Sequence, residues 1–95
     1  MSPYSATLGD LLAQNAITNG ARTELRTSDP EAGLRLTIHQ SDGSALTFQR
    51  APGGAATDWR VADLESPSGG CAFDEPVTDG WGRALDRLAQ GHLNP

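Results

Sequence analysis

Between residues 21 and 50, large apolar side chains alternate with polar ones in three short runs. A period of two places every second side chain on one side of a strand, so the pattern predicts strands over 21–27, 34–40 and 45–50 of a half-buried antiparallel sheet. The apolar members, expected on the dry side, are Leu25, Leu34, Leu36, Ile38, Leu46 and Phe48. The polar members, expected on the opposite side, include Arg22, Glu24, Arg26, Arg35, Thr37 and His39.

The turn between the second and third runs determines their register. It contains Asp42-Gly43, a pair that favours tight hairpins. A two-residue turn would put the apolar sides of the two strands out of phase, whereas a three-residue loop over 41–43 pairs Ile38 with Leu46. We therefore predict a type I turn followed by a bulge, with Gly43 at positive φ.

A helix is predicted before the first strand. Thr7 and Asp10 have the spacing of a capping box, with Thr7 as the N-cap. The helix is expected over 8–18 and to stop at Asn19-Gly20, where both residues tolerate the left-handed conformation. Its expected apolar stripe follows a helical period and comprises Leu8, Leu11, Leu12, Ala16 and Ile17.

The C-terminal half predicts two more strands and a second helix. A strand over 58–64 would place Trp59 and Val61 on one face, and a short strand over 71–74 would do the same for Cys71 and Phe73. A final helix over 80–90, capped by Thr78 or Asp79, carries an apolar stripe at i, i+4 and i+7. That stripe consists of Trp81, Leu85 and Leu88.

These elements predict one α+β domain over residues 1–95. It comprises an N-terminal helix, a four- to five-stranded antiparallel meander and a C-terminal helix. Both helices are expected on the same sheet face, because only their apolar stripes can cover it, and the other face is expected to stay wet. Residues 1–6 are expected to form a flexible arm and residues 92–95 a frayed tail.

Charge is unevenly distributed along the chain. The net charge is −5, of which residues 58–95 contribute −4 through three arginines and seven acids. An acidic surface of this kind suits a basic partner, such as a nucleic-acid-binding protein. The candidate partner-binding residues are the acids of this half together with the glycines of the loop over 51–57, namely Asp58, Asp63, Glu65, Asp74, Glu75, Asp79, Gly53 and Gly54.

The wet sheet face offers an alternative, cationic surface. Its predicted members are Arg22, Arg26, Arg35 and Arg60, with Glu24 as the central acid and a cross-strand partner for Arg35. An anionic partner could bind there, but no aromatic side chain is expected on this face. Direct nucleic-acid binding is therefore not expected, because sheet-based single-strand binders depend on aromatic stacking.

No catalytic or metal-binding constellation is expected. Cys71 follows two glycines, but a thiolate nucleophile needs a base, and the two histidines are predicted far from it. We expect Cys71 to be a small buried residue on a strand. One cysteine and two histidines lack the spacing of a zinc site, and a chain without lysine cannot form a phosphate-binding loop. No cofactor is expected.

The expected function is therefore a non-enzymatic interaction module that acts on a protein partner as an inhibitor or adaptor. In size, acidity and absence of motifs, the chain resembles small phage-encoded inhibitors of host defence, including anti-CRISPR proteins. The alternatives are a small acidic secretion-type chaperone, or a ligand-binding or enzymatic domain with a pocket between the helices and the sheet, lined by Trp59, Trp81 and Phe73. A lone cysteine and the absence of a signal sequence indicate the cytoplasm of a bacterium or infected host cell. The oligomeric state, monomer or homodimer, is left open.

Overall fold

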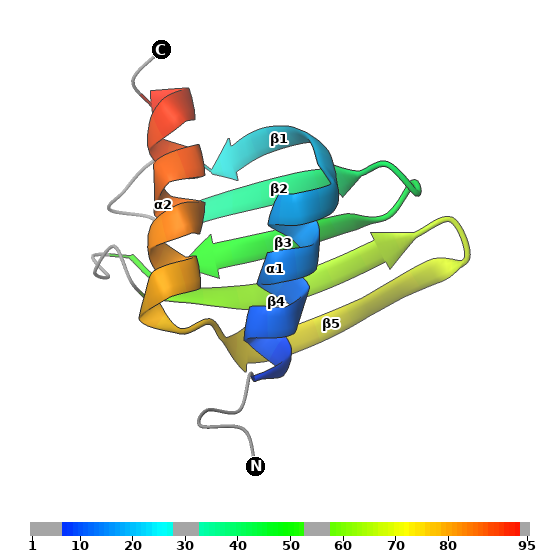
Figure 1. Cartoon of the computed structure of the whole chain (residues 1–95), viewed down its shortest axis with the longest axis horizontal. Coiled ribbons are helices and arrows are strands. Elements are labelled where there is room, and N and C mark those ends of the chain that lie inside the picture. Colours follow the sequence, from blue (N-terminus) through cyan, green and yellow to red (C-terminus); the bar gives the residue numbers. More distant parts are fainter. Residues whose placement is uncertain (1–6, 28–32, 53–57, 94–95) are drawn as a thin grey trace.

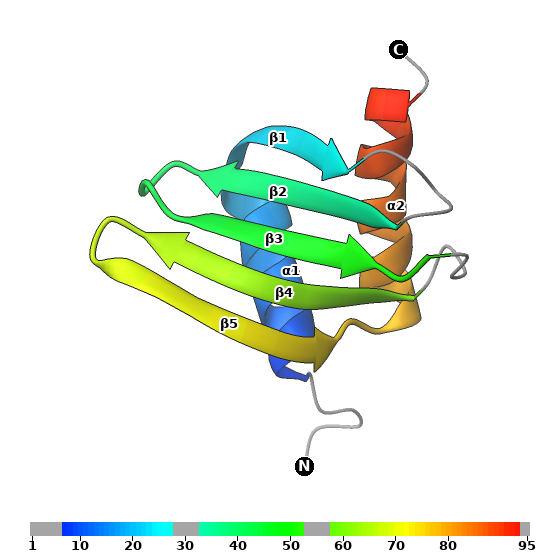
Figure 2. The ribbon, with the colours of Figure 1, turned by 180° about the vertical axis from the view of Figure 1, so that it is seen from behind.

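The computed structural model describes residues 7–27, 33–52 and 58–93 and has the predicted α+β architecture. The elements are α1 (Leu8–Asn19), β1 (Gly20–Thr27), β2 (Leu34–Gln40), β3 (Ala45–Arg50), β4 (Trp59–Ser66), β5 (Gly69–Pro76) and α2 (Asp79–Leu93). The five strands form one antiparallel sheet in chain order. Both helices lie on the same face of the sheet, as Figure 1 and the reverse view in Figure 2 show.

The predicted register of β2 and β3 is confirmed. Ile38 pairs with Leu46. The N–H of Gly43 donates to the Gln40 carbonyl at 3.1 Å, and Gly43 has a φ of 90°. Asp42 supports the turn, because its Oδ1 accepts from the Ser44 N–H at 2.9 Å and from the Ser44 hydroxyl at 2.6 Å. These bonds favour the ionised carboxylate and lower the pKa of Asp42.

The core lies between the sheet and the two helices. Alternate residues of the central strands point into it, as the period of two requires. The sheet contributes Leu34, Leu36, Ile38, Leu46, Phe48, Trp59 and Val61, each at most 1% exposed. The helices contribute mainly small residues and one leucine: Ala13, Ala16, Leu85 and Ala89.

The predicted apolar stripe of α1 is wrong in its first turn. Leu8 and Leu11 are each 47% exposed, while Gly9 is buried. Residues without large side chains let the helix backbone approach β5 closely, and a Cβ on Gly9 would overlap the Pro76 carbonyl oxygen. The predicted left-handed stop is also wrong, because Gly20 is extended with a φ of −68° and already belongs to β1.

Replacing Gly9 with alanine should destabilise the domain even though alanine is the better helix former. The propensity gain of about 1 kcal/mol is offset by overpacking against the Pro76 backbone, which costs about 1–3 kcal/mol. Gly91→Ala in α2 is the matched control, because its Cβ would meet no atom within 4 Å. Urea unfolding should therefore give opposite signs for the two variants. A Gly9→Ala protein as stable as Gly91→Ala would contradict the close approach of α1 to β5.

A buried carboxylate ties the beginnings of the two helices together. Thr7 caps α1 as predicted, since its Oγ1 accepts from the Asp10 N–H at 3.1 Å. The Asp10 carboxylate does not complete the predicted capping box with Thr7. Its Oδ1 instead accepts hydrogen bonds from the Thr78 N–H at 2.8 Å and from the Thr78 hydroxyl at 2.9 Å. The Thr78 carbonyl in turn accepts from the Gly82 N–H at 2.8 Å, which makes Thr78 the N-cap of α2.

The β4–β5 hairpin is longer than predicted. Its turn is Pro67-Ser68, so Gly69 and Gly70 pair in the sheet although their composition suggested a loop. Cys71 is exposed, which corrects the expectation of a buried residue, because this end of the hairpin projects beyond α1 (Figure 1).

At the other end of the chain, α2 continues through His92, whose Nε2 lies 2.8 Å from Thr23 Oγ1 on β1.

An ion pair fastens α2 to the sheet. Arg50 Nη1 donates to Asp86 Oδ1 at 2.8 Å, and the Trp59 indole N–H donates to the same oxygen at 3.3 Å. The Arg50 and Asp86 side chains are only 12% and 15% exposed. The pair therefore lies in a largely dry environment, where removal of either partner is costly.

Candidate interaction surfaces

Ion pairs cover the sheet face opposite the helices. Arg60 Nε donates to Asp74 Oδ1 at 2.6 Å. Arg35 Nη2 lies 3.6 Å from Asp63 Oδ2, so its partner is not Glu24 as predicted. Arg22 is exposed and forms no ion pair with another described residue. The carboxylates of Asp63 and Asp74, which were not predicted on this face, thus offset much of its positive charge.

Glu24 is the acid that the sequence analysis did place here. His39 Nε2 lies 3.1 Å from Glu24 Oε1, and Arg26 Nε lies 3.8 Å from the same oxygen. The pKa of Glu24 is lowered, first by the hydrogen bond with His39 and then by the charge of Arg26. Because the carboxyl pKa is lowered in the folded state, these contacts stabilise the fold at pH values above the ordinary pKa of about 4.5. Their stabilisation is lost as the pH falls through the pKa of the folded state.

The centre of this face is dry, contrary to expectation. Thr37 and Thr47 are 1% and 6% exposed, and their hydroxyl oxygens lie 2.8 Å apart across β2 and β3. Each hydroxyl can satisfy the other, so the pair tolerates burial. The face therefore offers no open row of cations at its centre.

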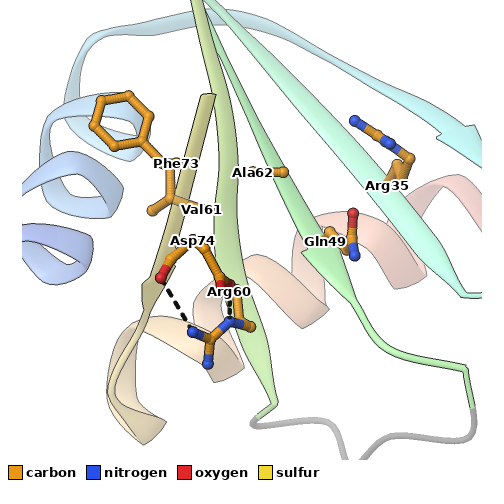
Figure 3. A pocket seen from close by; sticks show the side chains of 7 residues that line it. All are labelled: Arg35, Gln49, Arg60, Val61, Ala62, Phe73 and Asp74. Carbon is orange, nitrogen blue, oxygen red and sulfur yellow. Dashed lines mark hydrogen bonds and ion pairs between the residues drawn. The ribbon is translucent and has the colours of Figure 1, made fainter. Parts of the chain in front are cut away.

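A shallow hollow of about 230 Å³ lies on this face, lined in part by Arg35, Gln49, Arg60 and Asp74 (Figure 3). Cross-strand register places Arg35, Gln49 and Arg60 in one row along it. The Asp74 side chain and carbonyl already occupy Nε and Nη2 of Arg60. The hollow can thus accept a polar side chain from a partner, but it has little uncompensated charge with which to hold a free anion.

A second hollow of about 230 Å³ lies between β1 and the two helices. Its apolar lining includes Ile17, Ile38 and Leu88. The aromatic residues that the sequence analysis assigned to a pocket in this position do not line it. Trp59 is 1% exposed and belongs to the core, while Trp81 and Phe73 pack against that core.

Most of the predicted acidic residues lie on or next to the β4–β5 hairpin. Asp63 and Glu65 are on β4, Asp74 and Glu75 are on β5, and Asp58 directly precedes β4. None of the ion pairs among the described residues includes Glu65 or Glu75, so no described cation compensates their charges. Gly53, Gly54 and the side chain of Asp79 lie outside the described residues.

The hairpin ends the sheet, because β4 is the one described strand with which β5 pairs. Most of the β5 residues are exposed. The first turn of α1 lies against the end of β5, where the Gly9 Cβ position is 3.4 Å from the Glu75 carbonyl oxygen. The exposed Leu8, next to Gly9, therefore adjoins the acidic hairpin, whereas Leu11, about 200° around the helix from Gly9, points away from the sheet. Sequence reasoning missed this juxtaposition, because it assigned both leucines to the core.

Residues with reactive or metal-binding side chains do not converge. Cys71 donates weakly to the Ala72 carbonyl at 3.8 Å, while His39 bonds Glu24 and His92 bonds Thr23. Across the described ranges, no group of three or more histidine, cysteine or acidic side chains could hold a metal ion. None of the described helices is long and apolar enough to cross a membrane.

Comparisons with known proteins do not identify relatives of the chain. No family model, no curated protein sequence and no solved structure matches it.

Proposed function

We propose that the chain is a non-enzymatic interaction module that inhibits or adapts a partner protein by covering part of its surface. One observation carries the proposal: three features lie together at the β4–β5 hairpin. They are a sheet edge, the uncompensated carboxylates of Glu65 and Glu75, and the exposed Leu8 at the adjoining start of α1. Unpaired backbone groups, apolar surface and charge are the three features from which a protein interface is built.

The partner suited to this surface is a basic protein, and nucleic-acid-binding proteins carry such surfaces because they contact phosphates with lysine and arginine. An acidic module that covers a nucleic-acid-binding surface would act as an inhibitor in the manner of phage-encoded antagonists of host defence. The free thiol of Cys71 suits a reducing compartment, so we place this activity inside a bacterial or phage-infected cell.

Affinity capture from bacterial lysates tests this function. The native chain should retain one stoichiometric partner, and the double variant Glu65→Gln, Glu75→Gln should lose most of it. A matched control, Asn15→Lys with Thr18→Lys, changes the net charge equally at exposed positions of α1 and should retain the partner. Equal loss in both variants would show that only overall charge matters. Failure of the native chain to retain any protein, together with thermal stabilisation by a small molecule, would instead support a ligand-binding domain.

A further inference from the structure

We infer that β5 binds an extended, basic segment of the partner as a sixth strand, which deepens the proposed function and rests on it. In an antiparallel sheet, alternate residues of an edge strand turn their N–H and C=O groups away from their neighbour. In β5 these groups face the open side of the sheet, because β4 is its only paired neighbour among the described strands. A strand added there would satisfy them with main-chain hydrogen bonds.

The two edges of the sheet differ in their suitability for an added strand. The pairing of β1 with β2 shifts register twice, near Gly20 and near Thr27, and β1 carries Arg22 and Arg26. Bulges and cations are the usual means by which proteins protect a sheet edge. The pairing of β5 with β4 shifts register once, between Ala72 and Glu75, and is regular over Gly69–Ala72, and no residue of β5 is cationic. The structure therefore leaves β5 as the more receptive edge.

Charge specifies the chemistry of the added segment. Glu65 lies opposite Gly70, near the beginning of β5, and Glu75 lies near its end. Neither carboxylate is neutralised by an ion pair within the described part of the chain. Glu65 lies on β4, one strand in from the edge, on the face opposite the helices, whereas Glu75 pairs with Val61 and lies on the helix face. Carboxylates near the edge on both faces favour lysine or arginine in the incoming strand and disfavour acids.

The helix side of β5 specifies apolar side chains at alternate positions of the same segment. Phe73 is half-buried on that side, where it packs against the core, and Cys71 shares its face by strand alternation. Leu8, which is 47% exposed, lies on the adjoining first turn of α1. An added strand would thus point apolar side chains toward the helices beside Cys71 and Phe73, with a basic one at the level of Glu75. It would point basic side chains toward the opposite face near Glu65.

An eight-residue peptide of alternating arginine and valine is the probe for this site. Residue-resolved amide exchange of the full chain at low salt should show slower exchange at alternate residues of β5 when the peptide is added, by about tenfold or more at saturation, with α2 unchanged. A peptide in which prolines replace the valines should bind at least about tenfold more weakly, because it cannot donate the main-chain hydrogen bonds. Glu65→Gln with Glu75→Gln should weaken binding by about three- to tenfold.

Each of four results would overturn strand addition at β5. The first is that the arginine–valine peptide does not bind at millimolar concentration, and the second is that the proline peptide binds equally well. The third is that amide protection is centred on β1 or on the hollow at Arg35. The fourth is that amide protection of β5 rises with protein concentration in the absence of peptide. The last result would identify a second copy of the chain as the occupant. None of the four would remove the proposed function, which the capture experiment tests separately with a whole protein partner.

Discussion

Phe48→Ala should lower the free energy of unfolding by about 3–5 kcal/mol, the usual cost of truncating a buried phenylalanine. The side chain is fully buried in the middle of β3, opposite Leu36, where the central strands meet the helices. Alanine would lose most of the apolar burial and leave a cavity that the surrounding β-sheet cannot close. A domain of this length has a total stability on the order of 5–10 kcal/mol, so the variant should be close to unfolded.

Leu11→Ala is the control for this core prediction, since Leu11 is 47% exposed and should change stability by no more than about 0.5 kcal/mol. Thermal and urea unfolding, followed by circular dichroism, measure both variants. A loss for Phe48→Ala no larger than that for Leu11→Ala would show that the assigned dry face is wrong.

Asp86→Ala should cost about 3 kcal/mol, at the lower end of the range for breaking a buried ion pair. The Arg50 guanidinium would remain in a largely dry site, and the Trp59 indole N–H would lose its acceptor. The residual exposure of 12% and 15% keeps the expected cost from being larger. Urea unfolding measures this loss directly.

The double variant Arg50→Met, Asp86→Ala separates the unpaired charge from lost packing. Removing the arginine as well should recover much of the stability, because a matched apolar replacement of a buried pair is often nearly neutral. Arg83→Ala on the exposed side of α2 should change stability by no more than about 0.5 kcal/mol. If the double variant were as unstable as Asp86→Ala, the ion pair would not be the origin of the loss.

The central strands could be predicted from the sequence because their signals are local. Alternation sorts Leu36 and Ile38 from Thr37, and Asp42-Gly43 permits only one loop length that keeps the apolar sides in phase. The same alternation placed Trp59 and Val61 correctly in the core. Local pattern therefore determined the strand register before any tertiary contact was known.

The orientation of α1 could not be predicted in this way. Leucines at 8, 11 and 12 fit a helical stripe, but close packing on the sheet selected Gly9, Ala13 and Ala16 instead. A count of large apolar residues misses such a choice, since the free energy of packing depends on how near two backbones can come. The exposed Leu8 beside β5 is the consequence for the candidate site.

The ion pairs of Arg35 and Arg60 could be identified only once the register of β4 in the sheet was known. That register includes a shift between Thr47 and Phe48 in the pairing of β3 with β4, so the partners of Arg35 and Arg60 could not be assigned from spacing alone. Asp86 left no signal in the sequence either, because it follows Leu85 and lies about 100° around the helix from it, outside the predicted apolar stripe. Only the packing of α2 on the sheet brings it to Arg50.

Amide hydrogen exchange on the complex with whichever protein the native chain captures tests the central claim most directly. The structure predicts slower exchange along β5 and at the start of α1, with no change in β1 or the exposed face of α2. Protection confined to β1, to α2 or to the face that carries Arg35 would contradict the claim that the β4–β5 edge is the docking surface.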